Sequence, residues 1–291
     1  MKRLVAGLFC VLLSGVALAA GPSDVRKSVQ ASMLVTGTIE VATDGSVAQY
    51  TLDHPEKLPP VVTGLLAKAL PAWKFEPVVE DGKPVTAKAP VGLRVVAKPL
   101  GDGTYSISVT GAWFGDGAKD EKNVSQETIT YKRRVQPTYP RDAQEAGVAG
   151  TVYVLEKVNR DGTVGDAVAE QVDLRVIASD SQLAEWRRVL AGAALRALKQ
   201  GTFNPPITGK AVNRPYWVAR IPVDFSLSGP SAPAAVEKES YGHWRPYVPG
   251  PLQEPVWADK HVLAGSADAM PDGGSPLADT SLHLLTSLGG S

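Results

Sequence analysis

The sequence predicts an α+β fold made of two similar units in tandem, followed by an extended C-terminal tail. Alternating apolar and polar residues, the period of a half-buried strand, occur at positions 34–41 and again at 150–154. Each strand leads into a turn, Asp44-Gly45 or Asp161-Gly162, and then into a segment with helical spacing. Each series ends in a last apolar strand. We therefore expect two small antiparallel sheets of about three strands, each with helices on one face.

The composition is that of a globular protein. The chain has 291 residues, of which 44% are hydrophobic and 21% are charged. Its 30 basic and 30 acidic residues give a formal net charge of zero. A general nucleic-acid binder carries a basic excess or a clustered basic face. We therefore expect no nucleic-acid partner.

Residues 1–20 contain the three parts of an export signal. Lys2-Arg3 form a positive start, an apolar run extends from Leu4 to Leu18, and Ala17-Leu18-Ala19 is an A-x-A cleavage site. The apolar run is shorter than the roughly 20 residues of a membrane-spanning helix, so we expect cleavage. An uncleaved membrane anchor is the alternative. The only cysteine, Cys10, lies in this segment, and the mature protein should therefore contain neither a disulfide nor a reactive thiol.

Residues 21–99 form the first predicted unit. After the glycine turn a returning strand is expected at Val47–Leu52. The spacing of apolar residues then predicts a helix from Val61 to Ala69. Pro71 ends this helix, because proline lacks an amide hydrogen and clashes with the preceding turn. The closing strand of the unit is expected at Val91–Val96.

Residues 133–228 form the second unit, and residues 100–132 are expected to hold a strand and a linker. The second unit starts its first strand at Gly150, has a longer helix from Leu183 to Leu198, and closes on a strand within Trp217–Leu227. The landmarks of the first unit return here in the same order. This order indicates an internal duplication.

The tail, residues 229–291, has a different character. Gly, Pro, Ser and Ala dominate its start, and no period of two or of 3.6 residues survives. We therefore expect it to be extended or disordered. Its aromatic residues stand among prolines, and they either dock onto a partner or fold back over the protein itself. These residues are Tyr241, Trp244, Tyr247 and Trp257.

A set of residues in the second unit stands at spacings typical of a known domain. The set comprises Tyr139, Pro140, Ala143, Gly147, Gly150, Asp161, Gly162, Phe203, Pro205 and Gly209. With these residues the stretch from Pro137 to Phe225 resembles the C-terminal domain of the TonB family. The first unit resembles it from Gly37 onward but lacks the Tyr-Pro entry. The resemblance implies a small α+β module with an antiparallel sheet and helices on one face.

The resemblance also implies a function. Members of the TonB family dock an extended peptide from an outer-membrane receptor against a sheet edge, where main-chain hydrogen bonds give affinity and alternate side chains give selectivity. The closing strand is the expected edge here. Its candidate docking residues are Trp217, Val218, Arg220, Ile221, Val223 and Phe225. The implied protein is a non-enzymatic protein of the Gram-negative periplasm, and a TonB-dependent outer-membrane receptor is a candidate partner.

Two features depart from an energy-transducing TonB. The N-terminal segment has a cleavage site, and a folded unit stands where those proteins carry a proline-rich spacer. These departures favour binding of a protein segment over transmission of force and leave the latter open. One alternative is a membrane-anchored transport accessory of the energy-transducer type. The other is a cell-envelope assembly factor or a peptidoglycan-binding protein, or an enzyme whose site lies across the two units.

No catalytic or metal-binding motif stands out. The four histidines, His54, His243, His261 and His283, occur in neither H-x-x-x-H nor H-E-x-x-H spacing, so no metal is expected. No G-x-S-x-G elbow and no phosphate-binding glycine loop is present. The two Asp-Gly pairs are explained by their place in turns. We therefore expect neither enzyme activity nor a cofactor.

Overall fold

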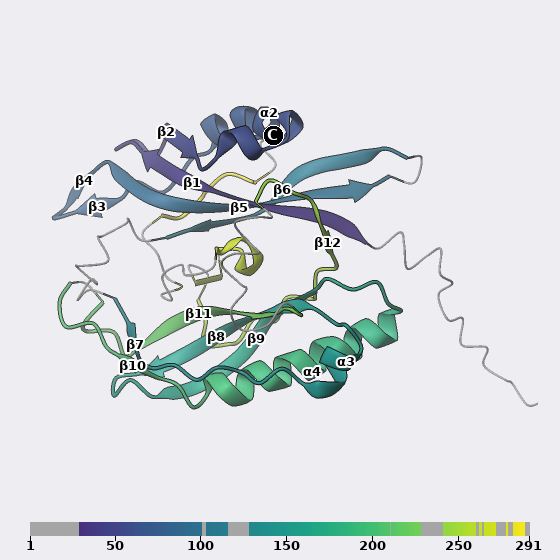
Figure 1. Cartoon of the computed structure of the whole chain (residues 1–291). Coiled ribbons are helices and arrows are strands. Elements are labelled where there is room, and N and C mark those ends of the chain that lie inside the picture. The colour runs from purple at the N-terminus through teal and green to yellow at the C-terminus, as the bar shows by residue number, and fades with distance from the viewer. Residues whose placement is uncertain are drawn as a thin grey trace, which may run out of the picture.

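The computed structural model describes residues 29–100, 103–115, 128–209, 211–227, 241–259, 262–263, 265–271, 278 and 282–288. Two antiparallel sheets lie one above the other, and helices cover the outer face of each (Figure 1). Segments of the C-terminal tail run between the two sheets (Figure 1). The fold is therefore α+β, with mostly antiparallel sheets and few helices. The expected export signal, residues 1–20, lies outside the described residues.

The first sheet is organised around β1 (Gln30–Val41). Antiparallel to it lie β5 (Ala87–Pro99) along most of its length, and β2 (Val47–Leu52) and β12 (Arg245–Tyr247) at its two ends. The outer side of β5 pairs with β6 (Tyr105–Phe114). β1 begins at Gln30, before the predicted position 34, because its first residues pair with β5 on one side and with β12 of the tail on the other. Local sequence carries no sign of that distant pairing.

Helix α2 (Pro60–Ala69) covers the first sheet. It begins with a proline, which is tolerated there because the first amide of a helix has no intrahelical partner. After Ala69 the chain tightens into the 3₁₀ turn η2 (Leu70–Ala72), which contains Pro71 as predicted. The remaining short elements of this part are η1 (Pro55–Lys57), β3 (Val79–Glu80) and β4 (Lys83–Pro84).

Three aromatic rings fill the core between α2 and the first sheet. Trp73, Phe75 and Phe114 are all buried. The ring centroids of Phe75 and Phe114 lie 5.0 Å apart, those of Trp73 and Phe114 6.1 Å apart, and both pairs meet edge to face. Such geometry suits the ring quadrupoles and adds to the free energy of area burial.

The second sheet has the strand order β11-β8-β9. β8 (Gly150–Asn159) is central and pairs antiparallel with β9 (Val164–Leu174) and with β11 (Tyr216–Phe225). Helix α4 (Asp180–Leu198) covers its outer face (Figure 1). The helix begins earlier than predicted. Beside it lie α3 (Arg141–Glu145) and the two-stranded sheet of β7 (Thr130–Arg133) and β10 (Thr202–Asn204).

A capping box explains the early start of α4. The Oγ of Ser179 accepts a hydrogen bond from the amide of Gln182, and the Gln182 side chain accepts one from the amide of Ser179. These reciprocal bonds satisfy amides that would otherwise have no partner at the helix N-terminus. The sequence pattern from Leu183 onward marks only the apolar part of the helix, which begins after this polar turn.

The two hairpins share their detailed geometry. We call β1, β2, α2 and β5 the first unit, and β8, β9, α4 and β11 the second unit. Gly45 and Gly162 have φ of 78° and 82°, which favours glycine. The amide of Phe75 donates to the Gly45 carbonyl, and that of Phe203 donates to the Gly162 carbonyl, each at 2.8 Å. A Cβ at either glycine would lie about 2 Å from the same phenylalanine's carbonyl oxygen.

The aspartates of the two turns are also equivalent. Asp44 accepts hydrogen bonds from the amide and hydroxyl of Ser46, and Asp161 accepts the same two bonds from Thr163. These bonds lower the pKa of both carboxyls. The turn role that the sequence predicts for both aspartates is therefore present in the structure.

The described part of the tail is extended and contacts both units. Tyr241 donates its hydroxyl to the Asp53 carbonyl at 2.6 Å, in the first unit. Val248 pairs with Leu174 of β9, in the second unit. The short turn η4 (Ala267–Ala269) lies against the first sheet again, and Leu284 pairs with Phe75. Of the two alternatives left by the sequence, the aromatic tail residues Tyr241 and Tyr247 therefore pack on their own protein.

Candidate functional site

β11 forms one edge of the second sheet. In an antiparallel pair, alternate residues point their main-chain groups toward the partner strand and away from it. The amide of Asn159 donates to the Thr163 carbonyl on the β9 side, so the main-chain groups of Asn159 point away from β11. Its partner on β11 is Tyr216, and the amide and carbonyl of Tyr216 therefore point away from β8. Following this alternation, the outward residues of β11 are Tyr216, Val218, Arg220, Pro222 and Asp224.

The chain covers this edge at Val218 and Arg220, which are buried, and leaves it exposed at Asp224. The one main-chain group that bonds to it among the described residues is the amide of Ala278, which donates to the Val218 carbonyl at 2.9 Å. Pro222 has no amide hydrogen, and proline is found within sheets mainly at outward edge positions such as this one. Of the outward residues near the C-terminal end of β11, Arg220 is buried, Pro222 is half-buried and Asp224 is exposed, so the main chain that a partner could reach lies at Pro222 and Asp224.

All six predicted docking side chains are buried. Four of them face α4 and belong to the core beneath it: Trp217, Ile221, Val223 and Phe225. Val218 and Arg220 point to the other face, which tail residues such as Val262 cover. The sequence places these residues on an edge strand, but it does not reveal that both faces of the strand are covered. The accessible part of this edge is its C-terminal end, at Pro222 and Asp224.

Arg220 is held by an ion pair inside the protein. Its Nε and Nη2 donate to the two carboxylate oxygens of Glu170, both at 2.7 Å, and both side chains are at most 2% exposed. Nη2 also donates to the Val262 carbonyl. Nη1 is buried and has no hydrogen-bond partner among the described residues. A buried pair of this kind is strongly destabilised when only one partner is removed.

The C-terminal end of the edge carries a second, half-exposed polar group. Arg175 donates to the Asp224 carboxylate at 2.6 Å and to the Thr151 hydroxyl at 2.9 Å. The Thr151 hydroxyl in turn donates to Asp224 at 2.9 Å. These bonds join the ends of β8, β9 and β11. They keep the main chain of Asp224 in place at the open edge.

The family-signature residues have structural positions. The Tyr139 ring packs edge to face on Phe225, with centroids 5.4 Å apart, and its hydroxyl donates to the Val148 carbonyl. Pro140 caps the start of α3, and Gly147 follows this helix with φ of 69°. Tyr139 and Pro140 therefore set the entry of the chain beneath the end of β11.

The remaining signature residues form the hairpin and the aromatic plug. A Cβ at Gly150 would lie 2.6 Å from the Asp173 carbonyl oxygen, so β8 and β9 approach closely there. Phe203 is buried and stacks on Tyr131, with centroids 4.9 Å apart. Pro205 follows β10. Together with Asp161 and Gly162, these residues position β11 without contacting its outer side.

Glu156 is a buried carboxyl that the sequence reasoning missed. It lies on β8 between Val154 and Val158, which both belong to the core under α4, and it is 1% exposed. Its Oε1 has no hydrogen-bond partner among the described residues. Burial raises the pKa of Glu156 to about 8. An acidic residue at a core position of an apolar strand was the available signal.

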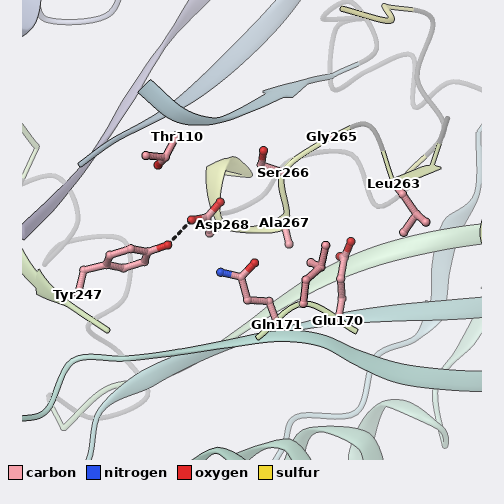
Figure 2. A pocket seen from close by; sticks show the side chains of 10 residues that line it. Thr110, Glu170, Gln171, Tyr247, Leu263, Gly265, Ser266, Ala267 and Asp268 are labelled. Atoms are coloured by element: carbon pink, nitrogen blue, oxygen red, sulfur yellow. Dashed lines mark hydrogen bonds between the residues drawn. The ribbon is translucent and has the colours of Figure 1, made fainter. Parts of the chain in front are cut away.

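A polar layer lies between the two sheets and includes a cavity of about 260 Å³ (Figure 2). Tyr247 donates its hydroxyl to Asp268 at 2.6 Å, and Glu170 and Gln171 extend from β9 toward the same turn (Figure 2). Arg94 of β5 donates to the Asp268 carbonyl. The sequence reasoning missed these residues, because each group finds its partner on a distant segment.

Asp173 belongs to the same layer. Its Oδ1 accepts hydrogen bonds from the Gln171 side chain at 2.8 Å and from the Gly250 amide at 3.0 Å. Burial, together with the nearby charge of Asp268, raises the pKa of Asp173 to about 7. This carboxyl therefore links β9 to the tail.

The described residues contain no cluster of metal ligands and no helix suited to cross a membrane. Among them, no three His, Cys, Asp or Glu side chains gather closely enough to hold a metal ion. In the same part of the chain, no helix combines the length and apolar character needed to cross a membrane.

Comparison with known proteins identifies the second unit. The family described as the Gram-negative bacterial TonB protein C-terminal matches residues 135–227. The match spans α3, β8, β9, α4, β10 and β11, and thus contains the open edge. Comparisons with curated proteins and with solved structures gave no match.

Proposed function

Residues 135–227 of this chain belong to the TonB C-terminal family, and on this premise we propose that the protein binds an extended protein segment by strand addition along β11. The family is associated with the Gram-negative envelope and with protein partners. The proposed protein is non-enzymatic, periplasmic and released from its N-terminal segment. A TonB-dependent outer-membrane receptor is the proposed source of the segment.

The observation that carries this proposal is the outward side of β11. An unpaired strand edge attracts a further strand because each unmet amide and carbonyl gains a hydrogen bond. Asp224 is exposed and, by the alternation of the strand, directs its amide and its carbonyl outward. Because most side chains of β11 are buried, affinity comes mainly from the main chain at this end of the strand. Selectivity then depends on how the side chains of the bound segment fit against α4 on one face of the sheet and against the tail on the other.

We further infer that the first and second units arose by internal duplication of one ancestral unit. The equal turn conformations, the matched Phe75 and Phe203 hydrogen bonds and the similar strand order support this. In the first unit most of the outer side of the closing strand is paired with β6. The proposed docking therefore uses the second unit alone.

Substitution at Asp224 tests strand addition at this edge. Asp224→Pro removes an outward amide, whereas Asp224→Ala keeps the amide and loses the same contact with Arg175. We expect Asp224→Pro to bind synthetic receptor peptides about tenfold more weakly than Asp224→Ala, the value of roughly one main-chain hydrogen bond with its strain. Isothermal titration with peptides from the periplasmic segments of a TonB-dependent receptor measures the difference. Equal affinities of the two variants would count against this edge.

The peptide itself provides a second control. Main-chain hydrogen bonds on one side of a strand repeat every two residues. N-methylation of successive peptide residues should therefore weaken binding at every second position only. Val223→Pro is unsuitable for the test, because the amide of Val223 points toward β8 and its loss would disrupt the sheet itself.

A further inference from the structure

The opposite edge of the second sheet, β9, is occupied by the chain's own tail. Leu174 and Val248 exchange two main-chain hydrogen bonds of 3.1 and 3.0 Å. Further along, the amide of Gln253 donates to the Glu170 carbonyl at 2.7 Å. The tail thus runs beside the end of β9 as an added extended segment. This is the geometry of a peptide bound at a sheet edge.

The tail segment is rich in proline, and α4 supplies a donor that suits it. Pro246, Pro249, Pro251 and Pro255 remove amide donors from the segment, and proline favours an extended conformation. Arg187 of α4 donates to the carbonyls of Val248 and Pro249 at 3.3 and 2.9 Å. It also donates to the Val172 carbonyl of β9 at 3.2 Å. One guanidinium therefore holds the helix, the strand and the segment together.

Gly250 marks the closest approach of the segment to β9. A Cβ at this position would lie 2.3 Å from the Val172 carbonyl oxygen and 3.0 Å from its amide nitrogen. Both are main-chain atoms, which cannot swing aside. The amide of Gly250 donates to Asp173. The site therefore selects a glycine after the first prolines of its ligand.

Aromatic side chains fix the two ends of the segment. The Tyr247 hydroxyl bonds to Asp268, and the indole N–H of Trp257 donates to Asp166 at 2.9 Å. Between them Val248 is buried in the core under α4, whereas residues 251–254 and Val256 are exposed. One buried apolar side chain and a few polar contacts therefore hold this stretch, as in a bound peptide with a single anchor residue.

We infer that the β9 edge, with Arg187, is a second peptide-binding site whose ligand class is a proline-rich extended segment with aromatic ends. The resident ligand is residues 241–259 of this chain, in which residues 248–257 contact the β9 side and the preceding Arg245–Tyr247 pairs with β1 of the first sheet. This site lies on the opposite edge from β11, so the inference is separate from the proposed receptor binding. The segment should bind when it is no longer covalently attached, and a peptide of the same sequence should replace it.

The test uses the full chain with two protease sites, one inserted between Leu227 and Tyr241 and one at residues 260–261. After double cleavage, a fluorescent synthetic peptide of residues 241–259 is added and its anisotropy is followed. We expect the labelled peptide to exchange into the folded protein, and unlabelled peptide to compete with it. Failure to exchange while circular dichroism reports a folded protein would overturn the inference.

Two variants sharpen the result. A peptide with Gly250→Val should compete at least about tenfold more weakly, because its side chain overlaps the main chain of β9. In the protein, Arg187→Met should weaken peptide binding about tenfold, whereas the exposed neighbour Arg188→Met should not, since Arg188 bonds to Glu185 instead. Equal competition by the Gly250→Val peptide would also overturn the inference. Asp224→Pro should leave this exchange unchanged, which separates the two sites.

Discussion

The two units share the construction of their hairpins and differ in the surroundings of their closing strands. Gly37 pairs with Leu52 and Val91, just as Gly150 pairs with Leu174 and Phe225. However, β6 of the same chain covers most of the outer side of β5, whereas among the described residues only Ala278 bonds to the main chain of β11 on that side. The hairpin geometry that the two units share therefore serves folding. The difference between their closing strands determines which strand edge is open to a partner.

The largest expected effect concerns the shared turn. Gly162→Ala introduces a Cβ 2.0 Å from the Phe203 carbonyl oxygen at a positive φ, and Gly45→Ala repeats this at Phe75. We expect each to lower the free energy of unfolding by about 4 kcal/mol, because backbone strain and a main-chain clash add together. Chemical denaturation monitored by circular dichroism measures both.

Gly147→Ala is the matched control for the turn. Gly147 also has a positive φ, but a Cβ there would meet nothing within 4 Å. Only the backbone strain remains, and the expected loss is about 1 kcal/mol. If all three variants lost the same free energy, the close approach to the phenylalanine carbonyl would have no energetic role, and the proposed equivalence of the two turns would lose its main support.

The next effect belongs to the second unit alone. Counted back from the two Asp-Gly turns, Glu156 of β8 stands where β1 has the apolar residue Ile39. Because its folded pKa of about 8 lies above the ordinary 4.5, the folded state binds the proton more tightly between these values. Stability is therefore lost as pH rises from about 4.5 to about 8. We expect Glu156→Gln to be more stable than the parent by on the order of 3 kcal/mol at pH 9.

The difference between Glu156→Gln and the parent should shrink below pH 5, where the carboxyl is protonated in both states. Denaturation curves at pH 4.5, 7 and 9 measure it. Glu254→Gln, which removes an exposed carboxylate, is the control for a general effect of charge. A constant difference across the pH range would show that Glu156 does not titrate on unfolding.

The smallest effect concerns the two helix starts. Helix α4 begins with the Ser179 capping box, whereas α2 begins at Pro59-Pro60 without a side-chain cap. Ser179→Ala should cost about 1 kcal/mol, because amides of the first turn lose their acceptor. Ser179→Asp keeps an acceptor and should restore most of the loss. An unchanged denaturation midpoint for Ser179→Ala would mean that packing alone fixes the start of α4.

The local elements of this fold could be predicted from the sequence, because their signals are local. Period-two alternation located β2 at Val47–Leu52, and helical spacing located α2 and most of α4. The Asp-Gly pairs located both turns. The extension of β1 to Gln30 could not be predicted, since its first residues pair with β5 and with β12, and β12 is more than two hundred residues away.

The sequence predicts that β11 is a strand, but it does not predict how much of that strand is accessible. Alternation along Trp217–Phe225 indicates one buried face, and Pro222 is compatible with an edge. Burial of the other face depends on Glu170 and on tail residues such as Val262. These contacts join segments that are far apart in the sequence, so no local sequence pattern predicts them.

The β-bridge between Leu284 and Phe75 makes folding of the first unit depend on residues near the C-terminus. The amide of Glu76 donates to the His283 carbonyl, the amide of Leu285 donates to the Lys74 carbonyl, and Leu282 lies in the core of the first unit. Contacts this far apart in sequence slow folding, since a long loop must close before they form. The first unit therefore stays unfinished until residues 282–288 have been synthesised.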